Sequence, residues 1–302
     1  MAEKRGRLRS PINWIGSKGR MVKNLLPYIP DHRTYVELFG GGASLLIARD
    51  PSPIEVYNDL NSGLVNFFRV LRDTKQFKQF QRLATLTPYA REEFDLCKQS
   101  WREQDDPVER AHRWFVVARM SFGGNFHSWG YGVTGSARGM ASQVSRWLGA
   151  VESLPEISTR LLRVQVENKD AFALIECYDS PETFFYLDPP YVMSTRKGGA
   201  YEHELTDESH RRLVKVLKEI KGKALLSGYA NPIYRELERS GWHRRDWEAI
   251  CSLSGRTRLN GLLGEGAAKS QRRVESIWFN YEVTESNGNY EMADTNDLPL
   301  AP

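Results

Sequence analysis

The chain has 302 residues, of which 40% are hydrophobic and 26% charged, with a formal net charge of +4 at pH 7. This length allows two domains, or one large domain that carries an insertion. Apolar runs stay well below the roughly 20 residues that cross a bilayer, and the start MAEKRGRLRSPINW lacks the apolar segment of a secretion signal, so we expect a cytoplasmic protein.

The first element in chain order is a short helix that carries Met21, Leu25 and Leu26. The segment NWIGSK precedes it and contains two residues suited to a cofactor. Trp14 has a flat ring that is able to cover a ligand, and Lys18 is able to pair with a ligand carboxylate. Taken alone, these two residue types favour the structural alternative, a packed tryptophan and a solvent-facing lysine.

Residues 34–61 are predicted to form a strand, a glycine loop, a helix and a second strand. The loop FGGGAS follows the apolar run TYVELF, and its glycines let a ligand approach the backbone closely. Asp59 ends the second strand, about 20 residues past the loop, where a carboxylate commonly binds ribose hydroxyls. A tight turn without a ligand and an aspartate that caps a helix are the structural alternatives.

Residues 62–154 are dominated by helical periodicity, with apolar side chains that recur every three or four positions, as in Leu64, Phe67, Phe68 and Leu71. The segment GGNFHSWGYGVTG interrupts this pattern. Its glycines and aromatic residues predict an irregular loop or a hairpin.

Strands and helices alternate again from Leu162 onward. Strands are predicted over RVQVEN, TFFYL, KALLSG and SIWFNYE, and helices over residues 207–220 and 232–241, the second closed by Gly241. This alternation predicts an α/β fold with a mostly parallel sheet, helices on both faces and the helical zone as an insertion. Residues 286–302 are polar and predicted to be disordered.

The most specific motif is Asp188-Pro189-Pro190-Tyr191, directly after a predicted buried strand. Ligands bind beyond the carboxyl ends of parallel strands, so the motif is placed to face a site. A carboxylate and a backbone carbonyl are able to accept hydrogen bonds from both N–H groups of an arylamine, and the prolines add no competing donor. Tyr191 offers a face on which an extruded base stacks. A rigid turn after a strand is the structural alternative.

Asp170 also follows a predicted strand, and it is suited either to an adenine amine or to capping the next helix. The cysteines form no CxxC pair and the histidines no HExxH cluster, so we expect free thiols at Cys97, Cys177 and Cys251 and no metal. The basic residues concentrate in a few groups, among them Arg256, Arg258, Lys269, Arg272 and Arg273. Such groups fit phosphate contacts, although a solvated surface gives the same pattern.

Taken in order, WIGSK, YVELFGGGAS, YNDLN, DPPY and a strand that ends in Asn280-Tyr281 resemble the Dam-type DNA adenine-N6 methyltransferases. The resemblance covers residues 11–281, loosely in the insertion. It implies a class I methyltransferase with a Rossmann-like, seven-stranded sheet. It also implies S-adenosylmethionine as methyl donor, double-stranded DNA as substrate and a bacterial or phage source.

The resemblance assigns residues 1–61 and 155–285 to a discontinuous catalytic domain and 62–154 to a target-recognition domain. The cofactor positions it implies are Trp14, Lys18, Glu37, Phe39, Gly41, Asp59, Asp170 and Asp188. Asp188, Pro189, Pro190 and Tyr191 fall at the catalytic, target-base positions. The DNA-binding residues we expect are Asn125, Phe126, His127 and Trp129 for the bases, and Arg256, Arg258, Arg272 and Arg273 for phosphates.

Two departures from the family pattern affect specificity and cofactor binding. Ala43 stands where the family's glycine loop often has its last glycine, and Gly123 and His127 stand where members that read GATC carry Asn and Arg. Arginine is the usual bidentate reader of guanine, so GATC is not the expected site.

We therefore expect a site-specific enzyme that methylates adenine N6 in DNA and acts on a flipped-out base. Methylation of RNA adenine, guanine N2 or cytosine N4 is the nearest alternative, and a catalytically inactive DNA-binding regulator is another. We expect a monomer or weak dimer that needs neither membrane nor metal, with a restriction endonuclease as a partner if the enzyme serves restriction.

Overall fold

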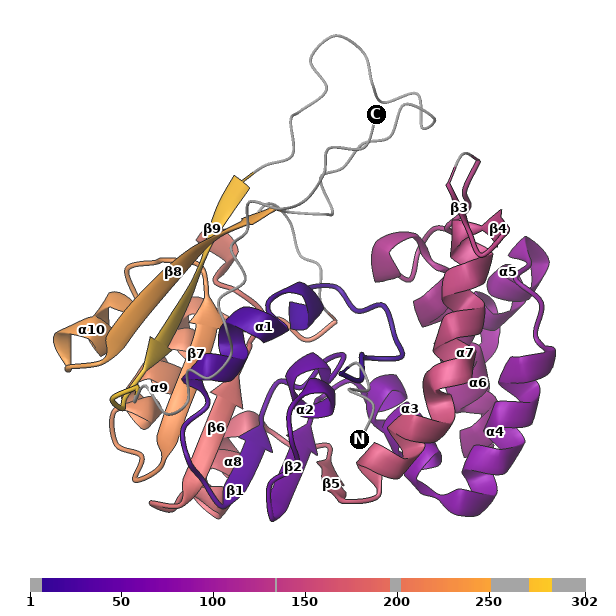
Figure 1. Ribbon diagram of the computed structural model, residues 1–302. Helices are drawn as coiled ribbons and strands as arrows, with labels where there is room; N and C mark the ends of the chain where they lie inside the picture. Colours follow the sequence, from indigo (N-terminus) through magenta and orange to yellow (C-terminus); the bar gives the residue numbers. More distant parts are fainter. Residues whose placement is uncertain (1–6, 134, 196–201, 251–271, 284–302) are drawn as a thin grey trace, which may run out of the picture.

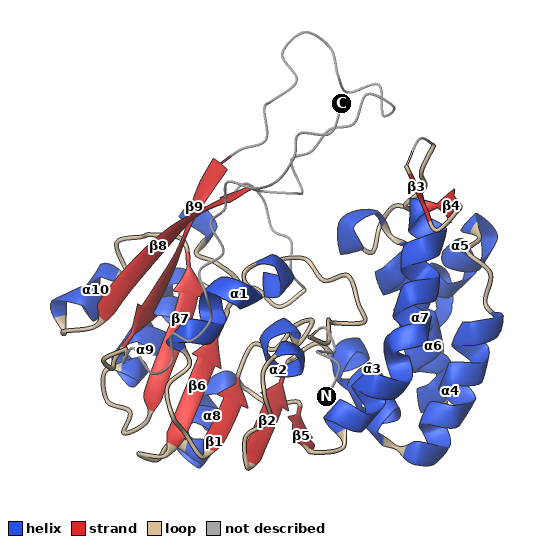
Figure 2. Cartoon of the chain, in the orientation of Figure 1, coloured by secondary structure: helices blue, strands red, loops and turns tan. Residues whose placement is uncertain are grey.

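The computed structural model describes residues 7–133, 135–195, 202–250 and 272–283, without the side chains of residues 249, 250, 272 and 273. The chain forms a lobe built on a sheet and a lobe of helices, which lie side by side (Figures 1 and 2). Within the described ranges, every helix is too short or too polar for a membrane span.

The sheet lobe is built on seven strands in the order β5-β2-β1-β6-β7-β9-β8. The first five in this order are parallel, and β9 inserts antiparallel between β7 and β8. The mostly parallel, seven-stranded sheet expected from the sequence is thus confirmed. The strand bounds are Thr34–Glu37 (β1), Ile54–Asn58 (β2), Val164–Glu167 (β5), Thr183–Leu187 (β6), Lys223–Gly228 (β7), His243–Ile250 (β8) and Arg272–Phe279 (β9).

Alternate side chains of the strands enter two separate hydrophobic cores. On one face, Val36 and Phe185 pack with α8 (Ala171–Tyr178), α9 (Asp207–Leu217) and α10 (Arg235–Arg239). On the other face, Tyr35 and Tyr186 pack with α1 (Val22–Leu25), α2 (Ser44–Ala48) and residues of the insertion. This two-sided burial explains the continuous apolar runs of the central strands.

Three element boundaries differ from those expected. The strand β8 was not predicted, because HRRDWEAI is an edge strand with few apolar residues. The helix expected over residues 232–241 shortens to Arg235–Arg239, since Asn231 Oδ1 accepts from Tyr234 N and begins a turn first. The last strand begins at Arg272 and ends at Phe279, several residues earlier than predicted.

The insertion is a bundle of helices with a small two-stranded sheet at its tip. Its elements are α3 (Ser62–Arg72), α4 (Thr74–Leu86), α5 (Arg91–Ser100), η3 (Trp101–Glu103), α6 (Pro107–Met120), η4 (Phe122–Gly124), β3 (Ser136–Ala137), β4 (Met140–Ala141) and α7 (Ser142–Leu161). Phe67 at its centre stacks on Phe115 at 5.3 Å and contacts Trp114 at 5.5 Å between ring centroids. The helical periodicity of residues 62–154 is confirmed.

A buried ion cluster joins the two lobes at the foot of the sheet. Arg160, near the end of α7, donates to both carboxylate oxygens of Glu55 on β2 at 2.6 and 2.7 Å and to the Leu46 carbonyl at 2.8 Å. Arg49 donates to the same carboxylate at 2.5 Å. The domain boundary expected at 154/155 falls inside α7, whose final turn thus belongs to the sheet lobe.

Candidate active site

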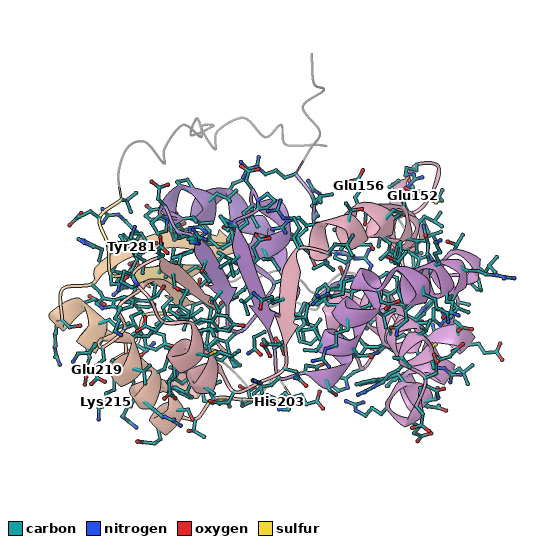
Figure 3. All side chains as sticks on the ribbon, turned by 90° about the horizontal axis from the view of Figure 1, so that it is seen from below. Glu152, Glu156, His203, Lys215, Glu219 and Tyr281 are labelled. Carbon is teal, nitrogen blue, oxygen red and sulfur yellow. The ribbon has the colours of Figure 1, made fainter. Side chains whose placement is uncertain are left out.

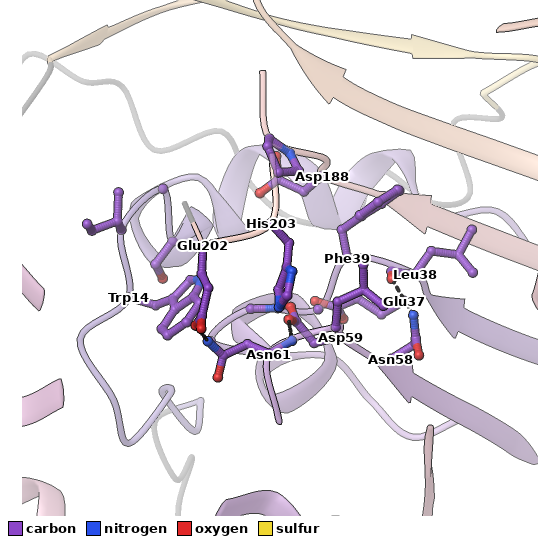
Figure 4. A pocket seen from close by; sticks show the side chains of 18 of the residues that line it. Trp14, Glu37, Leu38, Phe39, Asn58, Asp59, Asn61, Asp188, Glu202 and His203 are labelled. Carbon is purple, nitrogen blue, oxygen red and sulfur yellow. Dashed lines mark hydrogen bonds between the residues drawn. The ribbon is translucent and has the colours of Figure 1, made fainter. Parts of the chain in front are cut away.

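A cavity of about 710 Å³ opens at the carboxyl ends of β1, β2 and β6. Its walls include Lys18, together with Trp14, Glu37, Asp59 and Asp188, which Figure 4 labels. The volume lies within the range of small-molecule binding sites. Residues from distant parts of the sequence, and from both lobes, meet around this space.

The glycine loop after β1 forms the floor of the cavity at very close packing. A Cβ at Gly40 would lie 2.1 Å from the Tyr57 ring, and one at Gly41, where φ is +45°, would lie 2.8 Å from the Trp14 ring. Neither position tolerates a side chain. Ala43 adopts φ 52° and ψ 33°, a left-handed conformation that favours glycine, so the departure noted in the sequence falls on a strained residue.

Asp59 ties the end of β2 to this loop. Its Oδ2 accepts from Gly41 N at 2.9 Å, and its Oδ1 accepts from Asn61 N at 2.8 Å. Burial raises the pKa of Asp59, while these backbone donors and the nearby His203 lower it. Each carboxylate oxygen has a second lone pair, so Asp59 is able to hold the loop and still accept from a ligand hydroxyl.

Glu37 lies beneath the loop at the end of β1 and is only 2% exposed. Its Oε2 accepts from the Tyr35 hydroxyl at 2.9 Å and from Leu46 N at 3.1 Å. Burial raises the pKa of Glu37 to about 8, so a neutral acid predominates at pH 7 without a cationic ligand.

An aromatic cluster closes the side of the cavity next to the helical lobe. Trp14 contacts Trp114 of α6 at 6.0 Å and Phe126 at 5.9 Å between centroids. Arg119 of α6 also donates to the Asn13 side chain at 3.0 Å and so fixes the segment that carries Trp14. The cavity wall therefore depends on the insertion as well as on the sheet.

Residues 202–205 also line the cavity. Asn61 Nδ2 donates to Glu202 Oε2 at 2.8 Å, and His203 lies between the two lobes and points toward Asp59 (Figures 3 and 4). Sequence reasoning did not single out Glu202 or His203, because no motif or periodicity distinguishes them from a surface loop.

Asp188 lies at the end of β6 and is held by Lys18. The ammonium donates to both carboxylate oxygens, at 2.8 and 2.9 Å, and the side chains are 9% and 16% exposed. Burial raises the pKa of Asp188, and Lys18 opposes that rise. The sequence suggested a cofactor carboxylate as the partner of Lys18, whereas the structure shows the catalytic-motif aspartate.

Tyr191 interacts with Asp188 and is not among the residues that line the cavity. Its ring meets the edge of Tyr229 at 4.6 Å and 75°, and Lys18 Nζ lies 4.8 Å from its centroid. Its hydroxyl donates to Glu275 of β9 at 2.7 Å. Burial raises the pKa of Tyr191 well above its usual range, so the hydroxyl stays protonated.

Two residues beside Tyr191 were missed from the sequence. Tyr229 directly follows β7, the strand next to β6, and the strand-end rule that singled out Asp188 applies to it as well. Glu275 lies within an antiparallel strand, and the rule that ligands bind at strand ends does not apply to such a position.

Two further expected cofactor residues lie at the cavity wall opposite the insertion. Phe39 is partly buried against the core that contains α8. Asp170 caps α8, because its Oδ1 accepts from Phe172 N at 3.0 Å and from Ala173 N at 3.3 Å. Its other carboxylate oxygen has no hydrogen bond among the described residues, so capping leaves an acceptor for a ligand.

The expected base-reading residues fall into two environments. Asn125, Phe126 and His127 line the cavity mouth, and Asn125 Oδ1 already accepts from His127 N at 2.9 Å and from Ser128 N at 3.1 Å. Trp129 instead packs within the insertion, with the Arg91 guanidinium 4.5 Å from its ring. This segment is an irregular loop tied by a single bridge between Ser121 and Trp129.

A regular hairpin lies just beyond that loop, where β3 and β4 pair around Arg138 and Gly139. Both turn residues have positive φ, as a two-residue hairpin turn requires. Arg138 is exposed and donates to Glu152 at 2.8 and 3.0 Å. The expected phosphate-contacting Arg256 and Arg258 lie outside the described residues, and Arg272 and Arg273 are placed on β9 without described side chains.

Comparison with known proteins identifies the family of the chain. A family model of the D12 class N6 adenine-specific DNA methyltransferases matches residues 14–251. The chain belongs to this family. The match spans both lobes and every cavity residue named above, so the adenine methyltransferase expected from the sequence is confirmed.

Individual relatives agree with the family assignment at modest identity. The chain is 26% identical to the Type II methyltransferase M1.LlaDCHI of Lactococcus lactis subsp. cremoris, over 76% of this chain and 84% of the relative. It is 24% identical to the Type II methyltransferase M.CviBI of Paramecium bursaria Chlorella virus NC1A, over 75% and 85%. It is 25% identical to the DNA N-6-adenine-methyltransferase of Escherichia phage P1, over 76% of this chain and 31% of the relative.

The D12 assignment also accounts for the architecture. The mostly parallel seven-stranded sheet with helices on both faces is the class I methyltransferase fold. Among the described residues, no group of three or more His, Cys, Asp or Glu side chains is arranged to hold a metal ion.

Proposed function

We propose that this DNA adenine methyltransferase takes its methyl group from S-adenosylmethionine, held in the 710 Å³ cavity. The residues fit such a ligand in several ways. The glycine loop presents backbone to the cavity, Asp59 is suited to ribose hydroxyls, and Phe39 and Trp14 offer aromatic surface. Asp170 would offer an acceptor for an adenine amine, and Glu37 would offer a carboxyl group for the cationic part of the ligand.

The observation that carries this proposal is that Asp188 lines the cavity and also interacts with Tyr191, which does not line it. A methyl donor in the cavity and an extruded adenine against Tyr191 would meet at this aspartate. Direct transfer requires such an in-line approach, and positioning supplies much of the rate.

Asp188 and the Pro189 carbonyl accept hydrogen bonds from the adenine amine and direct its lone pair toward the cavity. S-adenosylmethionine, when bound, supplies an electrophilic methyl group. Lys18 opposes the effect of burial on the pKa of Asp188 and so favours the ionised carboxylate, which is the stronger acceptor. Pro190 stiffens the backbone at the junction, and Tyr191 provides the stacking face for the flipped base.

The roles of Asp188 and Tyr191 are tested by tritium transfer from labelled S-adenosylmethionine to unmethylated DNA. Asp188→Ala should abolish transfer and leave the fold intact, while Asp95→Asn, on the exposed surface of α5, serves as the control. Tyr191→Ala should lower turnover through lost stacking, which is worth about 1–3 kcal/mol per base. Turnover near that of the wild type in Asp188→Ala would refute the mechanism.

We further propose that sequence is read from the insertion, by the loop at Asn125–His127 and the adjoining β3–β4 hairpin. Both belong to the helical lobe (Figure 1), and Asn125, Phe126 and His127 line the cavity. Changes at Asn125 or His127 should alter the methylated motif at constant salt dependence. Changes at Arg272 and Arg273 should weaken binding to all sequences and flatten the salt slope. Methylome sequencing of both sets of variants tests this division. An altered motif in the Arg272 and Arg273 variants, with an unaltered motif in the Asn125 and His127 variants, would refute it.

Service in a restriction–modification system is a further proposal, supported by two relatives whose names call them Type II methyltransferases. It predicts that methylation protects DNA against a nuclease of the same sequence specificity. The digestion of methylated and unmethylated DNA with candidate nucleases tests it.

A further inference from the structure

Glu275 contacts the catalytic motif from a strand distant in sequence. It lies on β9, opposite Trp247 of β8 in register, and its neighbour Ser276 pairs with Gly228 at the end of β7. This register brings the Glu275 side chain to Tyr191, whose hydroxyl donates to Glu275 Oε2 at 2.7 Å. The two residues are 84 positions apart, so the contact depends on the complete sheet.

Several neighbours restrain the Tyr191 side chain. Tyr229 packs edge-on against the ring at 4.6 Å, Lys18 lies 4.8 Å from its centroid, and Asp188 interacts with the hydroxyl. The hydrogen bond to Glu275 fixes the position of the hydroxyl and therefore the axis of the ring. Rotation about that axis leaves the hydroxyl in place, and the edge-on ring of Tyr229 restrains it.

Stacking on an extruded base is favoured when the position of the ring is set before the base arrives. The hydroxyl and the Glu275 carboxyl oxygen lie 2.7 Å apart, which is the distance of a well-formed O–H···O hydrogen bond. A ring fixed in this way loses less conformational freedom when a base stacks on it.

We propose that Glu275 is a positioning residue that holds the Tyr191 ring in the orientation for stacking on the target adenine. It acts through Tyr191 and has no contact with the methyl donor, because it does not line the cofactor cavity. This inference rests on the proposed stacking role of Tyr191.

A double-mutant cycle tests the coupling. Glu275→Ala should lower kcat about tenfold, as expected for the loss of one hydrogen bond to a charged group. In the Tyr191→Phe background, which keeps the ring but has no hydroxyl, the same change should cost less than twofold. Glu275→Gln retains an oxygen acceptor and should recover at least a third of wild-type kcat. The KM for DNA and the Kd for S-adenosylmethionine should change less than twofold in all three.

The control is Val274→Ala, at the next position of β9, where the side chain is 47% exposed and alternates to the other face. Thermal melting reports the fold, and Glu275→Leu replaces Glu275→Ala if the latter unfolds at the assay temperature.

Equal losses from Glu275→Ala in the Tyr191 and Tyr191→Phe backgrounds would overturn the proposal, as would a parallel loss of cofactor affinity. If Tyr191→Ala retains full turnover, the stacking role itself fails. That result is distinguishable, because it does not depend on Glu275.

Discussion

The ion pair between Lys18 and Asp188 predicts how the stability of a Lys18 variant depends on pH. Lys18→Met removes the cation that donates to both Asp188 oxygens at 2.8 and 2.9 Å and leaves the carboxylate buried. The side chains are only 9% and 16% exposed, so solvent replaces little of the lost interaction. Breaking a pair of this kind costs about 3–5 kcal/mol.

The sign of the pH dependence follows from the pKa of Asp188. Burial already raises this pKa, and the loss of Lys18 raises it further. A carboxyl group whose folded-state pKa lies above its unfolded value lowers the free energy of unfolding increasingly as pH rises from the unfolded value through the folded one. The stability gap between wild type and Lys18→Met should therefore be large at pH 8 and small near pH 5. The acid limb of the activity profile should also move to higher pH in the variant.

Urea unfolding of both proteins at pH 5 and pH 8 measures the gap, and initial rates of tritium transfer from pH 5 to pH 9 give the activity profile. Lys23→Met, an exposed lysine on α1, is the matched control and should change neither. An equal loss of stability at both pH values would refute the electrostatic account and assign Lys18 to packing.

Three further predictions concern the cavity floor. Asp59→Ala should weaken S-adenosylmethionine binding at least tenfold, as measured by calorimetry, and affect DNA binding less. The variant loses both the proposed ribose acceptor and the hydrogen bond from Gly41 N. Unchanged cofactor affinity would show that Asp59 only stabilises the turn. Burial raises the pKa of Glu37 to about 8, so the free energy of unfolding of the wild type should fall from pH 5 to pH 8. Chemical unfolding of Glu37→Gln should show no such fall. An equal fall in both proteins would show that another group causes it. Ala43→Gly should change the free energy of unfolding by less than about 1 kcal/mol, since relief of the left-handed strain offsets the lost burial of the methyl group. Ala43→Val should destabilise the protein by more than about 1 kcal/mol. A larger loss of stability in Ala43→Gly than in Ala43→Val would show that the strain is negligible.

The sequence predicts the central sheet well, because parallel strands buried on both faces are continuous apolar runs and the residues after them gather at one edge. Asp59 and Asp188 were found by that rule, and both line the cavity. The edge strand β8 was not found, since one side of it lacks a neighbouring strand and its charged residues hide the strand pattern.

Contacts between distant segments account for what the sequence did not predict. The bond between Tyr191 and Glu275 and the pair between Lys18 and Asp188 depend on strand order and register, which local patterns do not contain. Phe126 was expected to contact DNA bases. In the structure its ring lies against Trp14, because α6 packs beside the glycine loop. A loop rich in aromatic residues predicts contact with a flat group, without specifying which one.

The identity of the methylated base tests the central claim most directly. DNA incubated with the enzyme and S-adenosylmethionine labelled in its methyl group is digested to nucleosides and separated by liquid chromatography with mass detection. The account predicts label in N6-methyldeoxyadenosine alone, and none when Asp188→Ala replaces the wild type. Label in N4-methyldeoxycytidine, or equal label with Asp188→Ala, would contradict it.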